Sequence, residues 1–213
     1  MNSINQPGDA AGQAVRPHAP HSEVFDEIYR TNAWGSGSGT GSTEENTRAY
    51  RDFLQAFMKL NRVSSVIDLG CGDWQFSKHI DWSGIRYIGI DVSGVVLANT
   101  RRHACEGVEF RQLDACVDPL PSADLLIAKD VLQHWSNSDI LGLLARRRSF
   151  RFALITNGYA ANGDRRTNTD ISAGMWRPVD LSKDPFSLSG AYVFDFIGDE
   201  PKQTFLWCNS AAP

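Results

Sequence analysis

Strand-like and helix-like segments alternate through the middle of the chain, and this alternation constrains the fold more than any other feature. Short apolar runs are separated by stretches whose apolar residues recur at helical spacing. The expected strands are Ser65–Leu69, Tyr87–Asp91, Val108–Leu113, Leu125–Ala128 and Phe152–Thr156, and the expected helices cover about 74–80, 94–103 and 137–148. Strands that alternate with helices form a parallel sheet with helices on both faces. We therefore predict an α/β fold with a doubly wound, Rossmann-like sheet.

Elements on both sides of this core complete the prediction. A helix with its N-cap at Ser42 or Thr43 is expected before the first strand. Its apolar face contains Tyr50, Phe53, Leu54, Phe57 and Met58. Residues 157–190 are rich in Asn, Asp, Gly and Pro, which predicts a long loop. Tyr192–Ile197 and Gln203–Cys208 are separated by five residues that include a glycine, so we expect an antiparallel hairpin and seven strands in all.

The length of 213 residues suits one domain. Residues 1–22 are polar and contain three of the nine prolines, which predicts a disordered tail before a single domain over 23–213. Lys and Arg number 21 against 25 Asp and Glu, for a net charge of -4, so no broad basic surface for nucleic acid is expected.

Neither a membrane span nor a leader peptide is expected, because no apolar run approaches ~18 residues and the N-terminus lacks an apolar segment. The four cysteines include no CxxC pair. This spacing does not match a zinc ribbon or a redox motif. We expect a cytoplasmic protein with reduced thiols and no membrane partner.

The segment Val66–Asp73, VIDLGCGD, is a buried strand followed by a Gly-x-Gly turn. Glycines there let the backbone approach a ligand closely, and the helix expected next would present unpaired N–H groups. A dinucleotide fingerprint requires a third glycine where this chain has Gln75. The turn therefore disfavours NAD.

Acidic residues end the next two predicted strands. Asp91 follows Gly72 by 19 residues, where a carboxylate can accept hydrogen bonds from a ribose diol. Asp114 ends the third strand and is followed by the small residue Ala115. Helix caps and turns would explain each acid separately, but not the ordered set. The set predicts a site for S-adenosylmethionine (SAM).

These segments resemble the class I SAM-dependent methyltransferases over about residues 43–210. VIDLGCGDW is similar to their first motif, YIGIDVS to their second, FRQLDA to their adenine-contacting segment and ADLLIAKDVLQHW to their fourth strand and the turn after it. The resemblance implies SAM as methyl donor and S-adenosylhomocysteine (SAH) as product. The cofactor contacts carried over by position are Asp68, Gly70, Gly72, Asp91, Val92, Asp114, Ala115, Lys129, Trp34 and Arg48. Gly70 and Gly72 would face the methionine portion of SAM, whereas Arg48 would pair with its carboxylate or remain a solvated charge.

A second resemblance is to a subgroup of small bacterial members. It lies in a W-G-S-G loop, here Trp34–Ser42, and in an N-x-D-I-x-x-G-x-W-R segment from Asn168 to Arg177. We associate this subgroup with surface-polysaccharide and specialised-metabolite gene clusters, which fixes no substrate. The loop is either a flexible linker or, as we favour, a lid over the SAM and the acceptor, with Trp34 as an apolar cover.

His134 is the candidate general base, because it follows the fourth strand and a neutral imidazole is common at pH 7. A capping or core-edge histidine is the alternative. The candidate acceptor contacts are Trp135, Asn157, Tyr159, Trp176 and Arg177. Trp176 and Arg177 would offer an aromatic face and a fork for carboxylate or phosphate. Alternatively, both residues anchor their loop.

No metal is expected. Asp130 and Asn157 offer oxygen ligands, but the acid-amide pair of metal-dependent relatives is incomplete because only Asn157 follows the fifth strand. We predict methyl transfer to an oxygen or nitrogen of a small polar molecule, such as a sugar or a phosphorylated metabolite. The alternative is a non-catalytic SAM-binding module that regulates or scaffolds a partner. The oligomeric state is left open.

Overall fold

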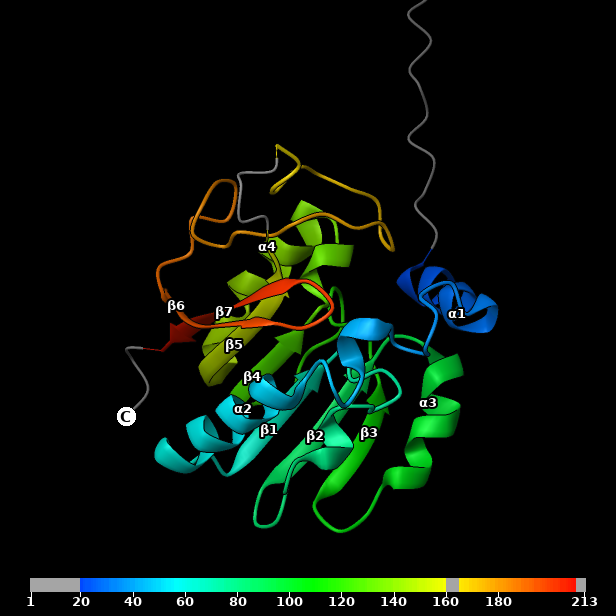
Figure 1. The fold of residues 1–213 in the computed structure, drawn as a ribbon, viewed down its shortest axis with the longest axis vertical. Helices are drawn as coiled ribbons and strands as arrows, with labels where there is room; N and C mark the ends of the chain where they lie inside the picture. The colour runs from blue at the N-terminus through cyan, green and yellow to red at the C-terminus, as the bar shows by residue number, and fades with distance from the viewer. Residues whose placement is uncertain (1–19, 160–164, 210–213) are drawn as a thin grey trace, which may run out of the picture.

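One mixed sheet of seven strands organises the computed structural model, which describes residues 20–159 and 165–209 (Figure 1). The strand order is β3-β2-β1-β4-β5-β7-β6. The strands are β1 (Ser65–Leu69), β2 (Arg86–Asp91), β3 (Val108–Gln112), β4 (Ala123–Lys129), β5 (Phe150–Gly158), β6 (Ala191–Ile197) and β7 (Pro201–Cys208). The first five are parallel, and β7 pairs antiparallel with both β5 and β6. The predicted doubly wound sheet with its C-terminal hairpin is confirmed.

Helices cover both faces of the sheet. They are α1 (His21–Thr31), α2 (Arg48–Leu60), α3 (Gly94–Thr100) and α4 (Asn137–Ala145). Neighbouring residues of β1 point to opposite faces, so Val66 packs in the cluster that includes α2 and α3, whereas Ile67 packs in the cluster that includes α1 and α4. Strands buried on both faces have near-continuous apolar sequences, as β1 and β4 do. The predicted apolar face of α2 is present, with Tyr50 and Leu54 fully buried.

The start of α2 differs from the prediction. Ser42 ends a 3₁₀ turn, η1 (Thr40–Ser42), and the helix begins only at Arg48. Between them the Thr47 hydroxyl donates to the Thr43 carbonyl over 2.7 Å, which stabilises a turn ahead of the helix. The predicted N-cap at Ser42 or Thr43 is therefore wrong.

The expected helix over 74–80 is also wrong. Only a 3₁₀ turn forms there, η2 (Ser77–His79). Trp74 has a φ of 62°, in the left-handed region that an α-helix does not use. The Gly-x-Gly turn is consequently followed by an irregular segment and a 3₁₀ turn instead of the expected α-helix.

Other boundaries shift as well, and the helix predicted over 94–103 ends at Thr100, with a 3₁₀ turn over Arg101–His103 after it. α4 ends at Ala145, and a 3₁₀ turn, η5 (Arg147–Ser149), leads into β5. The tail predicted over 1–22 is too long, because α1 already begins at His21; residues 1–19 lie outside the described part of the chain.

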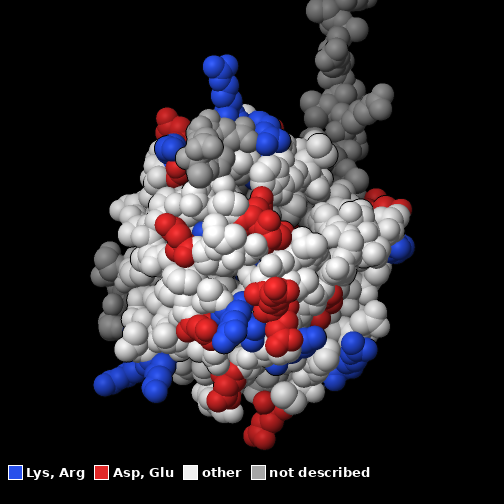
Figure 2. Space-filling model, viewed as in Figure 1, with Lys and Arg blue, Asp and Glu red and all other residues white. Residues whose placement is uncertain are grey.

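In the part of the chain described, no helix has both the length and the apolar character needed to cross a bilayer. Figure 2 shows one face of the molecule, on which Lys and Arg side chains are spread out and do not gather in one extended basic patch.

Candidate active site

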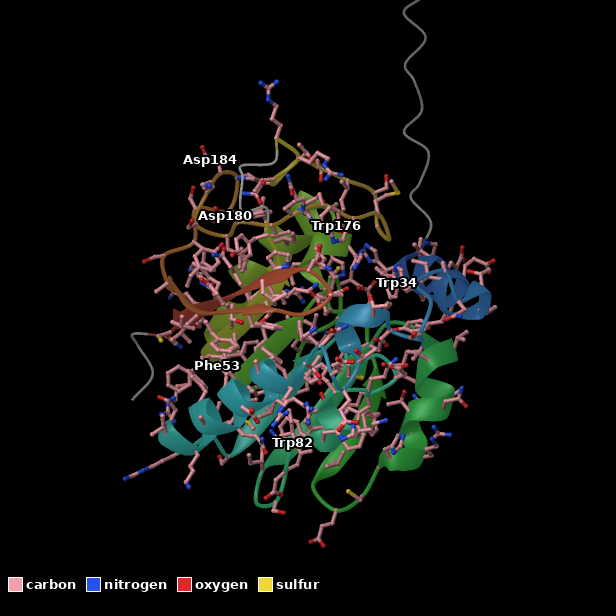
Figure 3. The ribbon with its side chains drawn as sticks, in the orientation of Figure 1. Trp34, Phe53, Trp82, Trp176, Asp180 and Asp184 are labelled. Carbon is pink, nitrogen blue, oxygen red and sulfur yellow. The ribbon has the colours of Figure 1, made fainter. Side chains whose placement is uncertain are left out.

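A pocket opens at the carboxyl ends of the parallel strands, where doubly wound sheets bind their ligands. The sheet side of the pocket consists of Leu69, Gly70, Ile90, Asp91, Val92, Leu113, Asp114, Ala115, Cys116, Lys129 and Asp130. α1 and the loop after it form the cover, with Phe25, Tyr29, Trp34 and Ser38 on the pocket wall (Figure 3, where Trp34 is labelled).

The turn after β1 permits close approach to the backbone. Gly70 has a φ of 70° and Gly72 a φ of 53°, both in the region that favours glycine. A side chain at Gly70 would collide with Val131, and one at Gly72 would collide with Ser38. Only glycines therefore leave room for the packed turn and the pocket beside it.

Asp91 lies at the tip of β2 and is 7% exposed. Its two carboxylate oxygens accept the backbone N–H groups of Gly72 and Ser93, at 3.0 and 2.9 Å. Burial raises the pKa of Asp91 to about 6, against the lowering effect of these hydrogen bonds. The group is ionised at neutral pH, and a carboxylate has further lone pairs with which to accept the hydroxyls of a diol.

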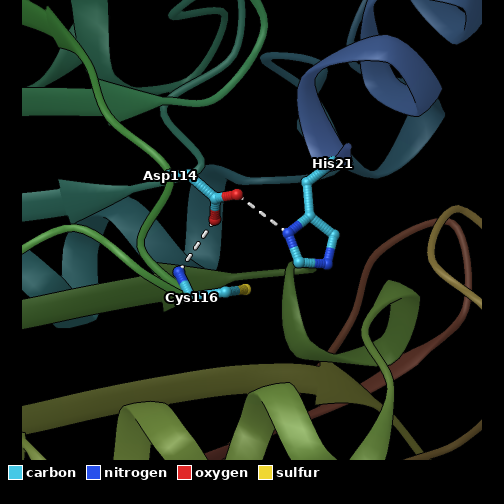
Figure 4. A group of neighbouring side chains, drawn as sticks. All are labelled: His21, Asp114 and Cys116. Carbon is cyan, nitrogen blue, oxygen red and sulfur yellow. Dashed lines mark hydrogen bonds and ion pairs between the residues drawn. The ribbon is translucent and has the colours of Figure 1, made fainter. Parts of the chain in front are cut away.

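Asp114, after β3, connects the pocket to α1 (Figure 4). His21 Nδ1 lies 2.9 Å from one Asp114 oxygen, and the Cys116 N–H donates to the other over 2.9 Å. His21 Nε2 lies 3.3 Å from Asp139 at the start of α4. Burial lowers the pKa of His21, but Asp114 and Asp139 outweigh this effect and raise it. A ring nitrogen of His21, a carboxylate oxygen of Asp114 and the sulfur of Cys116 lie within 4.8 Å of one another. The hydrogen bonds among these residues hold α1 against the pocket.

His134 ends the 3₁₀ turn η4 (Leu132–His134) that follows β4. Its Nδ1 lies 2.9 Å from the Met175 carbonyl oxygen, which can only accept a hydrogen bond. Nδ1 therefore bears the proton, and the lone pair of Nε2 in the neutral imidazole is 3.5 Å from the Gln133 side-chain nitrogen. Burial lowers the pKa of His134, against the raising effect of the Met175 hydrogen bond. This is the protonation state that a general base requires.

A second pocket adjoins the first at this histidine. Both are lined by Trp34, Ser38, Asp130 and His134. The rest of the second pocket consists of Gly39, Thr40, Gly41, Gln133, Trp176, Asp199, Glu200 and Lys202. In Figure 3, Trp176 lies on the long loop between β5 and β6, away from α2. Two ligands that meet end to end would meet beside His134 and Trp34, whose rings lie 5.0 Å apart.

Residues 11–159 match the family model of the O-methyltransferase domain. The chain belongs to this family. Its seven-stranded, mostly parallel sheet with an antiparallel C-terminal end is the fold of the class I SAM-dependent methyltransferases, and solved methyltransferases match it over most of the chain.

Two curated relatives are similar to part of this O-methyltransferase domain. A trans-aconitate 2-methyltransferase of Methylobacterium nodulans is 35% identical over 118 residues, which cover 53% of this chain and 45% of that protein. An acetylserotonin O-methyltransferase of Bos taurus is 30% identical over 132 residues, which cover 60% of this chain and 38% of that protein. The chain thus spans less than half the length of these relatives.

Solved structures show the likeness of fold at low sequence identity. The magnesium protoporphyrin IX methyltransferase of Synechocystis, solved with bound SAH, has a TM-score of 0.62 and 12% identity over 90% of this chain and all 100% of that chain. The human N-acetylserotonin methyltransferase, solved with SAM, has a TM-score of 0.54 and 19% identity over 88% of this chain and 59% of that chain.

The O-methyltransferase domain places most of the predicted cofactor contacts in the first pocket. These are Gly70, Asp91, Val92, Asp114, Ala115, Lys129 and Trp34. Gly72 contributes its N–H to Asp91. Asp68 lies outside the pocket, where Tyr87 and Ser77 donate to it at 2.5 and 2.9 Å, and burial raises its pKa to about 6. Arg48 is exposed and lines neither pocket, so the solvated alternative describes it.

The predicted acceptor contacts are more scattered. Trp176 lines the second pocket, whereas Trp135 lines the first. Asn157 is buried and accepts the Gln133 N–H, and Tyr159 lines neither pocket. Arg177 is 1% exposed and donates to the carbonyls of Leu132 and Trp135, at 2.7 and 2.9 Å. The proposed grip of Arg177 on an anionic acceptor is therefore wrong, and its loop-anchoring alternative describes it.

Several pocket residues were not predicted from the sequence. His21 was assigned to the tail, although it starts the amphipathic helix that contains Phe25 and Tyr29. Asp130 was considered only as a metal ligand, but its carboxylate joins Lys129 and Lys202 in ion pairs. The turn between β6 and β7 gave no signal beyond its hairpin pattern, yet Asp199 and Glu200 line the second pocket.

Proposed function

We propose that this domain transfers the methyl group of SAM to an oxygen or nitrogen of a small polar acceptor, such as a sugar or a phosphorylated metabolite. The observation that supports this most directly is the meeting of two pockets at His134. One has the acids and glycines suited to a nucleoside with a methionine tail, and the other has polar and aromatic walls. We also propose that the described elements form one catalytic domain, because their strands share one sheet.

SAM supplies an electrophilic methyl group on a sulfonium, and the domain's own residues position and deprotonate the acceptor. Asp91 accepts hydrogen bonds from ribose hydroxyls, and the Gly70 turn leaves space for the methionine portion. Trp34 excludes water from the junction of the pockets. His134 Nε2 takes the proton of the acceptor hydroxyl, and the Met175 carbonyl holds the imidazole in the required tautomer.

Calorimetric titration with SAM and SAH tests the cofactor site. We expect saturable binding by the wild-type chain and a loss of about 1–3 kcal/mol of binding free energy in Asp91→Ala, because a buried ligand-binding carboxylate is removed. Asp81→Ala is the matched control, since Asp81 is an exposed acid outside both pockets and its removal leaves SAH affinity unchanged. Equal affinity in a folded Asp91→Ala would remove Asp91 from the site.

Release of SAH with a panel of small acceptors tests catalysis. We expect acceptor-dependent SAH formation above the rate without acceptor. Tight SAM binding without turnover on any acceptor would instead favour a SAM-binding module with a regulatory or scaffolding role.

A further inference from the structure

The second pocket contains a buried lysine, Lys202, whose charge is balanced by neighbouring carboxylates. Lys202 has a side chain that is 2% exposed, and its ammonium group has three N–H donors. Three carboxylates lie within reach of it, Asp130 at 2.9 Å, Glu200 at 2.8 Å and Asp199 at 3.3 Å. Lys202 donates a hydrogen bond to Glu200 and forms ion pairs with Asp130 and Asp199, so its positive charge is already compensated.

The neighbouring lysine is also committed. Lys129 Nζ donates to the Gly41 carbonyl over 2.9 Å and forms an ion pair with Asp130 over 2.5 Å. Its side chain is 1% exposed, and its ammonium group lies over the rings of Tyr50 and Phe76. Three carboxylates therefore face two ammonium groups, and the cluster has a net negative charge.

Among the described residues that line this pocket, the exposed charged groups are carboxylates. Asp199 and Glu200 form the exposed edge, with side chains that are 29% and 32% exposed. His134 Nε2 lies 3.5 Å from the Gln133 side-chain nitrogen, and Arg177, the predicted anion-binding group, donates to backbone carbonyls instead. Among the described residues that line the pocket, every Lys is paired with a carboxylate.

We propose that this pocket selects a neutral or cationic acceptor with hydroxyl groups and rejects polycarboxylates and phosphate esters, and that Asp199 and Glu200 determine this specificity. The inference rests on the proposed function, because it identifies the second pocket with the methyl acceptor. An anion placed here meets the carboxylates of Asp199 and Glu200 beside a lysine whose charge is already compensated, and like charges brought together in this way are strongly unfavourable. Hydroxyl and ammonium groups donate to the same edges, while Trp34 and Trp176 offer apolar faces.

The proposed selectivity distinguishes this chain from one of its relatives. It also favours one of the two proposed acceptor classes, the sugar and the phosphorylated metabolite, over the other. The Methylobacterium nodulans relative is named for trans-aconitate, a tricarboxylate. The charges of the second pocket favour the sugar over the phosphorylated metabolite.

Calorimetry with trans-aconitate and inorganic phosphate as probes tests the proposal on the full chain saturated with SAH. We expect no saturable binding of either anion by the wild type up to about 10 mM, equivalent to an affinity weaker than about 3 kcal/mol. Asp199→Asn/Glu200→Gln releases Lys202 from two of its three charged partners, and the anions should then bind at least about tenfold more tightly. Asp195→Asn removes one charge from the same hairpin outside the pocket and should match the wild type.

Each outcome decides the proposal. Binding of trans-aconitate or phosphate by the wild type below about 1 mM, or a folded double variant without improved anion binding, would overturn it. Glu200→Gln alone serves if the double variant does not fold. SAH affinity is measured first, because a folded chain that does not bind SAH contradicts the proposed function before any anion is tested. The anion titrations without SAH still report on the Lys202 cluster.

Discussion

The two pockets differ in how far apart their residues lie in the sequence. The sheet side of the first pocket comes mainly from the ends of β1, β2 and β3, which follow one another along the chain. The second pocket combines the Trp34 loop, the turn after β4, the long loop at Trp176 and the β6–β7 turn. A site made of consecutive strand ends has a sequence signature, whereas a site made of distant loops has none until the chain is folded.

The pockets also differ in the groups that bind their buried carboxylates. Asp91 is held by two backbone N–H groups and retains lone pairs for a ligand. Asp130 is held between the ammonium groups of Lys129 and Lys202. The lysines lower the pKa of Asp130 below its usual range even though burial opposes them. The first acid is suited to recognise a ligand, and the second to hold the pocket wall together.

Removal of Lys202 should have the largest effect and tests whether the acid cluster is structural. Lys202→Met leaves Asp130 buried with one partner fewer, and loss of one member of a buried ion pair costs about 3–5 kcal/mol in the free energy of unfolding. Lys183→Met is the control, since the Lys183 side chain is 72% exposed and its pair with Asp180 should contribute about 0–1 kcal/mol. Urea unfolding measures both. Equal free energies of unfolding for Lys202→Met and Lys183→Met would show that the ion pairs of Lys202 do not stabilise the wall of the second pocket.

Removal of the base should reduce turnover and leave cofactor binding intact. We expect kcat of His134→Ala to fall at least about tenfold, and by about 10²–10⁴-fold for an alcohol acceptor, with SAH affinity unchanged. His103→Ala removes a histidine that lines neither pocket and should retain wild-type turnover. SAH release measures kcat, and near-normal turnover of a folded His134→Ala would show that His134 is not an essential base.

The sequence predicted the sheet and the acids at its strand ends because apolar periodicity and motif spacing are local properties. It did not predict that Arg177 would be buried, since the same Trp-Arg pair fits a ligand site or a loop anchor until its carbonyl partners are known. The helix expected at 74–80 does not form: Trp74 has a left-handed backbone, and its ring packs against Tyr87 and Phe110 of later strands, contacts that a local apolar pattern does not reveal.

The pH dependence should distinguish the two pockets. Burial lowers the pKa of His134, so kcat at saturating SAM should rise with pH through a midpoint below the ordinary ~6.5 of histidine. Asp91 has a pKa of about 6, so SAM affinity should weaken as pH falls below that value and the carboxyl becomes protonated. Rate profiles at saturating SAM and calorimetry at pH values around 6 measure these separately. A kcat midpoint above the ordinary histidine value would contradict the tautomer and charge assigned to His134.

Closure of the loop at residues 34–42 should give the smallest effect, because the loop is already anchored. Ser38 accepts the Asp73 N–H and contacts the Tyr29 hydroxyl, both at 3.0 Å, and the Ser38 N–H donates to the Asp73 carboxylate over 3.3 Å. A ligand beneath the loop adds contacts to Trp34 and lowers the population of open states, from which amide hydrogens exchange. We therefore expect SAH to slow exchange in this loop by about threefold to tenfold. Residues 101–107, which line neither pocket, should exchange at the same rate with and without SAH. If the loop also exchanges at an unchanged rate while SAH binding is confirmed, the loop is a linker that the ligand does not close.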